Sequence, residues 1–149
     1  MLRQSYRLVP PVQLERLFEP FRVIYKEASF PNDFSGLVMP LPNYPDWFLL
    51  AVNKEHPLGR RRFTIAHELG HIVMHHIPIR VELRSDIKEK EANAFAADLL
   101  MPADEVRHCM LQGMTVSDMA SYFGVSVSAM SVRLDMLGLS KPDKLGGVM

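Results

Sequence analysis

The residues with the clearest chemical potential in this sequence are two histidines that flank a glutamate. His67, Glu68 and His71 form the pattern His-Glu-x-x-His. Residues four apart on an α-helix differ by about 40° around its axis, so both imidazoles leave one face, one turn apart. Two neutral imidazole nitrogens at that spacing can bind one zinc ion at ~2.0–2.1 Å. Glu68 lies about 100° away, where its carboxylate can take a proton from a water molecule. The motif predicts a hydrolytic metal site.

The same pattern also arises by chance in helices that bind no metal, and the surrounding residues argue against that reading here. The motif lies within an apolar helical stretch, so His67 and His71 come close to a buried face, where unpaired polar groups are costly. Gly70 costs about 1 kcal/mol relative to alanine inside a helix. We interpret Gly70 as a position at which another backbone or a ligand comes close.

A third ligand should come from a separate element, and the following helix offers two carboxylates. The apolar stripe of that helix centres near Ala92, with Glu89 roughly 50–60° from the centre and Glu91 more than about 100° away. We expect Glu89 to face inward and bind the metal, with Glu91 as the alternative. Asn93 could hydrogen-bond a ligand histidine and fix its tautomer, or it is a partly exposed helix amide. The metal is expected to be zinc, although two nitrogens and one oxygen suit several divalent ions.

Two further histidines follow the motif on the same helix. His75 shares the motif's face but is one turn further on, so its reach is poor. We interpret His75 and His76 as residues that cap the helix or support the ligands. Met74 and Ile77 stand where the longer metzincin pattern needs glycine and histidine, which excludes that pattern.

The metal ligands need a scaffold, and the sequence indicates which elements supply it. The motif belongs to a helix predicted from Arg61 to a stop at Pro78, and a second helix is predicted from Asp86 to Met101. Stretches rich in β-branched and aromatic residues, separated by turn-forming residues, predict short strands. The expected strands are 21–28, 36–41 and 47–52, and the other expected helices are 12–19, 103–111, 116–123 and 126–137.

These elements predict an α+β fold in which a small antiparallel sheet packs on the motif-bearing helix and on the helix that carries Glu89. Pro40 should lie at an edge or an end of its strand. The strand 47–52 (WFLLAV) is expected to offer an exposed edge that holds a substrate peptide by strand addition. Tyr44, Tyr122 and His108 remain alternatives for the residue that stabilises an oxyanion.

Composition and charge exclude several classes of protein. The chain has 149 residues, 48% of them hydrophobic and 23% charged, as in a globular domain with or without a small appendage. Lys+Arg 17 balance Asp+Glu 17, whereas proteins that bind bulk nucleic acid or anionic membranes normally show a basic excess. Cys109 is the single cysteine, which excludes an internal disulfide. We find no secretory signal or membrane-spanning run and expect a cytoplasmic protein.

Two blocks of the sequence together resemble a known family. RRFTIAHELGHIVMHH, followed by EKEANAFAADLLMP, is similar to the ImmA/IrrE-type metallopeptidases over roughly residues 47–102. The family has a gluzincin-like motif helix and a downstream helix that carries a glutamate. Its E-x-x-A-[ND] pattern falls on Glu89, Ala92 and Asn93, although the family often shows a second acidic residue at the position of Glu91. The resemblance implies a zincin-like metallopeptidase domain over residues 1–112 and a small helical appendage over 113–149.

The resemblance also implies a function. Members of the family are cytoplasmic zinc peptidases that cleave a helix-turn-helix repressor, frequently encoded beside them on a prophage, a conjugative element or a stress operon. Cleavage, or in some cases binding alone, relieves repression. We therefore expect a repressor-cleaving peptidase, with a non-hydrolytic regulator that binds its repressor and a DNA-binding transcription regulator as alternatives.

The last part of the sequence bears on the DNA-binding alternative. Residues 116–137 resemble a helix-turn-helix, with Gly124 at the turn. The segment carries Asp118, Arg133 and Asp135, which gives it a net charge of −1. Because contacts to phosphates need cationic side chains, this charge disfavours DNA binding by this chain alone. The segment could instead grip the substrate repressor or simply pack on the catalytic unit.

Overall fold

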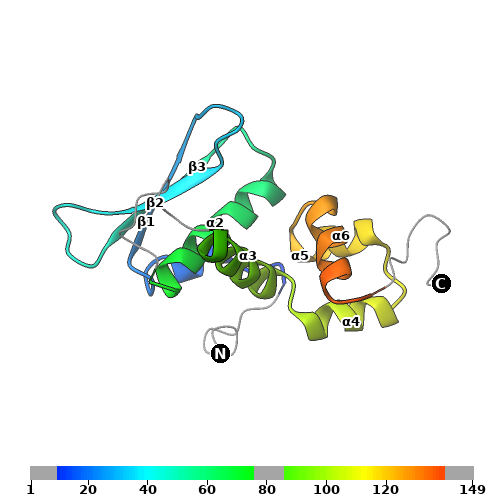
Figure 1. Ribbon diagram of the computed structural model, residues 1–149. Helices are drawn as coiled ribbons and strands as arrows, with labels where there is room; N and C mark the ends of the chain where they lie inside the picture. Colours follow the sequence, from blue (N-terminus) through cyan, green and yellow to red (C-terminus); the bar gives the residue numbers. More distant parts are fainter. Residues whose placement is uncertain (1–9, 76–85, 140–149) are drawn as a thin grey trace. The chain divides into compact units, whose positions relative to one another are not determined.

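The computed structural model describes residues 10–75 and 86–139, and it has an α+β architecture. Three strands come first and the long helices follow, as Figure 1 shows. The elements are η1 (Leu14–Leu17), β1 (Val23–Ala28), β2 (Gly36–Pro40), β3 (Phe48–Asn53), α2 (Leu58–Val73), α3 (Asp86–Leu100), α4 (Ala103–Leu111), α5 (Val116–Phe123) and α6 (Val127–Met136). The predicted strands and helices are confirmed within a few residues, except that the first helix is a short 3₁₀ turn and that α2 ends at Val73, before the predicted stop at Pro78, which lies outside the described residues.

The sheet is mixed, so the prediction of an antiparallel sheet was wrong. The strand order is β1-β3-β2. β2 and β3 form an antiparallel pair, whereas β1 runs parallel to β3, with Val23 opposite Phe48. The sheet is mixed because β1 does not pair with β2, the next strand in the sequence. Instead, β3 lies between β1 and β2 and pairs with both. Pro40 ends β2 at an edge of the sheet, as predicted, since an edge strand needs no donor there.

The strand β3 lies at the centre of the sheet, which corrects the expectation that WFLLAV offers an exposed edge. Both edges of β3 are paired, one with β1 and the other with β2. Its last four residues, Leu50 to Asn53, are all buried. An uninterrupted apolar run is typical of a strand covered on both faces, and this is the environment that β3 has.

The helix α2 packs against β2 and β3 (Figure 1). Its apolar side chains Ile65, Ala66 and Leu69 are buried. The approach is close. A Cβ atom at Gly36, the first residue of β2, would lie only 2.8 Å from the Cγ2 atom of Thr64 in α2. The absence of a side chain at Gly36 therefore lets the helix settle onto the sheet.

The described residues form two compact units, one from Gln13 to Ala96 and the other from Ala97 onward, together with residues before Gln13. The first unit holds the sheet, α2 and most of α3. In the second unit, α5 and α6 pack together and are joined through Gly124, whose φ of 70° lies in the left-handed region. Thr115 and Asp118 form a capping box at the start of α5. The predicted division at residues 112 and 113 stays a prediction.

The sequence predicted no membrane-spanning run, and the lengths of the helices can be compared with that prediction. Among the described helices, none combines the length and the apolar composition that crossing a bilayer would require.

Candidate metal centre

The motif histidines project from the middle of α2 toward one point. The Nε2 atoms of His67 and His71 lie 3.1 Å apart, and the two rings meet edge to face. The side chain of His71 is fully buried, and that of His67 is 15% exposed. The spacing of four residues therefore has the effect predicted from helix geometry, because both imidazoles present a nitrogen to the same small volume.

The third member of the cluster comes from α3. One carboxylate oxygen of Glu89 lies 3.1 Å from Nε2 of His67, and the other lies 3.1 Å from Nε2 of His71. One potential ligand atom from each residue can be chosen so that all three lie within 4.8 Å of one another. Within the described part of the chain, this is the group of side chains that could hold a metal ion.

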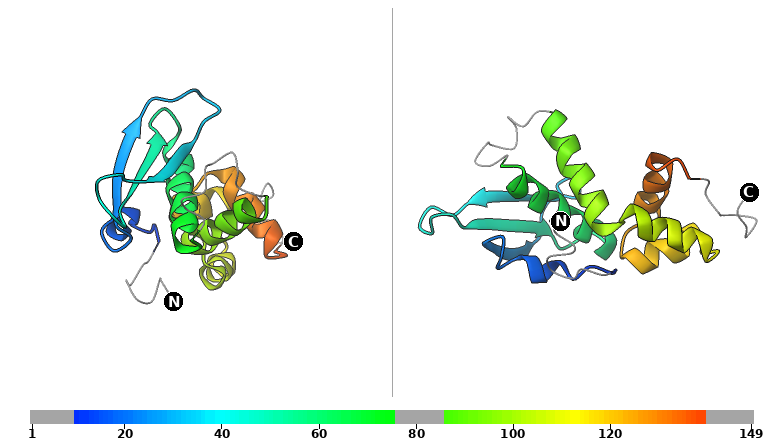
Figure 2. Two further views of the ribbon diagram at one scale, coloured as in Figure 1. Left: turned by 60° about the vertical axis from the view of Figure 1, so that its left-hand side comes forward. Right: turned by 90° about the horizontal axis from the view of Figure 1, so that it is seen from below.

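The helices α2 and α3 lie close together (Figure 2). Gly70 is at one of their contacts and permits the approach that the cluster needs. A Cβ atom at Gly70 would lie 3.2 Å from the Cα atom and from the carbonyl oxygen of Ala92. Of the two alternatives left open for Gly70, close approach by another backbone or by a ligand, this contact shows the first. Ala92 is fully buried at the crossing, and Glu89 lies one turn before it on α3.

Asn93 provides a test of whether the cluster fits a cation. Its Oδ1 atom lies 2.8 Å from Nδ1 of His67. An amide oxygen only accepts, so a neutral His67 carries its proton on Nδ1 and turns an unprotonated Nε2 toward Glu89. A nitrogen lone pair that faces a carboxylate oxygen at 3.1 Å is repelled, and a cation between them removes the repulsion. Two nitrogens and one carboxylate are a donor set that suits zinc.

The other predicted site residues have the following positions. Glu68 is buried, with 5% exposure, and follows His67 directly in α2. Its role as a base stays a prediction. Glu91 is exposed and is not part of the cluster. His75 comes just after α2 with a φ of 58° and is also exposed, whereas His76 lies outside the described residues.

Sequence reasoning found no partner for His56, and the structure places it in a buried polar network. His56 is 3% exposed and contacts the carbonyl oxygen of Asn32 through Nε2, at 2.8 Å. Asn53, three residues earlier, is fully buried, and its Nδ2 atom lies within hydrogen-bond distance of carbonyl oxygens in the same loop. No signal in the sequence sets these two residues apart, because Asn53 and His56 belong to a run of four polar residues, 53–56, between the apolar strand and the motif helix.

Comparisons with known proteins agree with this site. A family model described as Peptidase_M78, IrrE N-terminal-like domain, matches residues 46–135, a range that contains all three residues of the cluster. Metallopeptidase ImmA of Bacillus subtilis (strain 168) is 27% identical over 101 residues, which cover 62% of this chain and 59% of that protein. The chain thus matches well under two thirds of that relative's length.

A solved structure supports the fold. A Mycobacterium tuberculosis transcriptional regulator superposes with a TM-score of 0.59 and 23% sequence identity, over 84% of this chain and 40% of that one. At this identity the likeness concerns the fold alone.

Proposed function

Because this chain belongs to the IrrE N-terminal-like domain family of peptidases, we propose that it is a zinc-dependent endopeptidase whose metal is held by His67, His71 and Glu89. The observation that carries the proposal is the convergence of two imidazole nitrogens and one carboxylate from two different helices. Three protein ligands leave a coordination position for water or substrate, which is the arrangement of catalytic rather than structural zinc sites.

Each residue around the cluster has a distinct part in this mechanism. A bound zinc ion would polarise the scissile carbonyl and make a water molecule more acidic. Glu68 accepts the proton that the attacking water loses and delivers it to the departing amine. Asn93 accepts a hydrogen bond from Nδ1 of His67 and thereby holds that ring in the orientation and tautomer that a ligand needs.

The proposed substrate is a helix-turn-helix repressor, which places the reaction in the cytoplasm. This part of the proposal depends on the family resemblance, with relief of repression as its consequence. The helices α5 and α6, joined at Gly124, form a helix-turn-helix-like pair that we assign to gripping this partner rather than DNA. Support comes from Arg133, the single cation within residues 115–139, which is 7% exposed and bonded inside the protein. It therefore offers little to a phosphate.

The test is incubation with the repressor encoded by the neighbouring gene. We expect the purified chain to contain about one zinc ion and to cut that repressor at a defined bond. Glu68→Gln should keep the zinc ion and lose cleavage, because the amide cannot accept the proton. Cleavage by Glu68→Gln at the parent rate would overturn the assigned mechanism. Derepression that survives this substitution would identify the protein as a non-hydrolytic regulator that binds its repressor.

A further inference from the structure

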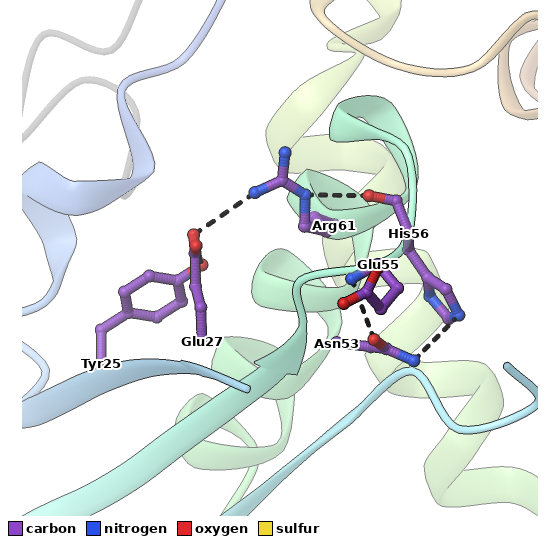
Figure 3. Close-up of polar contacts among 6 residues, drawn as sticks. All are labelled: Tyr25, Glu27, Asn53, Glu55, His56 and Arg61. Atoms are coloured by element: carbon purple, nitrogen blue, oxygen red, sulfur yellow. Dashed lines mark hydrogen bonds and ion pairs between the residues drawn. The ribbon is translucent and has the colours of Figure 1, made fainter. Parts of the chain in front are cut away.

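Asn53, the last residue of β3, joins two segments that are distant in the sequence. Its Nδ2 atom lies 2.9–3.1 Å from the carbonyl oxygens of Phe30, Pro31 and Phe34, all in the loop between β1 and β2. Its Oδ1 atom accepts a hydrogen bond from the backbone nitrogen of Glu55, at 3.0 Å. Figure 3 shows this second contact in the turn between β3 and α2.

His56 makes the next link between the same two segments. Its Nε2 atom lies 2.8 Å from the carbonyl oxygen of Asn32 and must donate, because a carbonyl oxygen only accepts. The side chain is 3% exposed, and its Nδ1 atom has no hydrogen-bond partner in the described part of the chain. We call Asn53 and His56 together the loop clasp, since the two side chains lie within hydrogen-bond distance of the carbonyl oxygens of residues 30, 31, 32 and 34 in one loop.

Arg61 connects the loop clasp to the first turn of α2. Its Nε atom donates to the carbonyl oxygen of His56 at 3.0 Å, and its Nη1 atom lies 3.4 Å from Oε2 of Glu27 in β1 (Figure 3). The same oxygen of Glu27 accepts a hydrogen bond from the hydroxyl group of Tyr25. Burial and this hydrogen bond raise the pKa of Tyr25, so the hydroxyl group stays a donor.

The start of α2 depends on such tertiary contacts because its own sequence does little to fix it. Among the described residues, no side chain caps the helix at Pro57, and its first turn contains no acidic residue. The arginines at 60, 61 and 62 are instead near the positive end of the helix dipole, where cations are unfavourable. When a helix lacks these local signals, the position of its first turn depends on hydrogen bonds to other parts of the protein.

We propose that the loop clasp positions the candidate metal ligands by fixing where α2 begins. His67 and His71 lie on the same rigid helix, about two to three turns after Arg61. A metal site tolerates only about 0.5 Å of misplacement of its ligands. Movement at the start of α2 would displace His67 and His71 and therefore lower the affinity for the metal. Asn53 and His56 are therefore positioning residues, and this inference rests on the proposed function for its metal-binding consequence.

The first test uses Asn53→Asp, which keeps the shape of the side chain but turns a carboxylate oxygen toward three carbonyl oxygens. We expect a folded protein in which the amides of residues 58–64 exchange with deuterium at least 10-fold faster in EDTA. Its zinc affinity, measured by competition with a chromophoric chelator, should fall at least 10-fold. The control is Ser29→Ala, which removes the exposed contact between Ser29 and Glu55 in the same region and should match the parent in both measurements.

The second test compares two substitutions of His56 and remains available if Asn53→Asp does not fold. Gln retains a donor for the carbonyl oxygen of Asn32, whereas Leu does not. We expect His56→Gln to recover most of the parent's zinc affinity and its visible spectrum with Co²⁺, and His56→Leu to lose both. Equal values for the two folded variants would overturn the proposal.

The two readouts separate this inference from the proposed function. Faster exchange at residues 58–64 does not require metal, so it supports the positioning role even if the parent takes up no zinc, in which case the proposed function fails. Parent-like exchange and zinc affinity in folded Asn53→Asp would instead overturn the positioning role and leave the proposed function intact.

Discussion

Gly70 in α2 lies directly against the backbone of Ala92 in α3, so that a Cβ atom at Gly70 would be 3.2 Å from the Cα atom of Ala92. His67 and His71 flank Gly70, and Glu89 lies one turn before Ala92. A close contact between the two helices thus lies beside the residues of the candidate metal site. With the helices this close, the carboxylate oxygens of Glu89 lie 3.1 Å from Nε2 of His67 and from Nε2 of His71.

We predict that Gly70→Ala weakens metal binding without unfolding the protein. Alanine gains about 1 kcal/mol in helix propensity, which offsets the strain of the new methyl group in the metal-free state. The helices must move apart by a few tenths of an ångström. Zinc affinity, measured by chelator competition, should therefore fall about 10-fold, because the ligand geometry is sensitive to such shifts. Zinc affinity equal to the parent's would show that Glu89 follows the movement without cost.

Glu89 and Glu91 form a matched pair for testing the third ligand. Glu89 lies 3.1 Å from both imidazoles, whereas Glu91 is exposed outside the cluster. Glu89→Gln replaces a charged ligand by a neutral amide and should reduce zinc content to well under half of the parent's after dialysis. Glu91→Gln makes the same chemical change and should leave zinc content unchanged. The reverse result would assign the ligand role to Glu91.

Asn93 should influence metal binding through the proton of His67. Asn93→Ala removes the acceptor for Nδ1 of His67 and should lower zinc affinity about 10–100-fold, the usual range for residues that orient a metal ligand. Asn93→Asp keeps an acceptor at the same position and should restore affinity to near that of the parent. If both variants bind zinc as the parent does, the contact at 2.8 Å has no part in metal binding.

The helices and the inward-facing position of Glu89 could be predicted from the sequence because both depend on local periodicity. The angle of a residue around a helix follows from counting, and it separates Glu89 from Glu91 without any knowledge of tertiary structure. The short strands were recognisable for the same reason, since their side chains favour extended backbone. The cost of glycine inside a helix predicted a close approach at Gly70 but did not distinguish another backbone from a ligand.

The order of the strands could not be predicted in this way, because pairing is a long-range choice. The loop between β1 and β2 is short enough for a hairpin, yet β3 pairs with both strands. The apolar run WFLLAV is compatible with a covered central strand, which is its place in the structure. The prediction placed it at an edge. The links of Asn53 and His56 to the loop at 30–34 are also invisible locally, since they join residues more than 18 positions apart.

Arg133 in α6 supplies a last prediction, on stability. Its Nε atom donates to the carbonyl oxygen of Met101 at 2.9 Å, and Nη2 lies 3.6 Å from Asp98. Burial lowers the pKa of Arg133, yet the guanidinium group stays charged at neutral pH. Arg133→Met keeps most of the aliphatic contacts but leaves the Met101 carbonyl without its donor, so the free energy of unfolding should fall by about 1–3 kcal/mol. The measurement is urea denaturation.

Asp98→Asn is the matched control for that measurement. The Asp98 side chain is 69% exposed, so its ion pair with Arg133 is screened by water, and its loss should change the free energy of unfolding by less than about 1 kcal/mol. A larger effect for Asp98→Asn than for Arg133→Met would mean that the ion pair, rather than the bond to the Met101 carbonyl, holds α6 in place. Because Arg133 is already engaged inside the protein, neither variant should create or abolish salt-sensitive binding to DNA in a gel-shift assay.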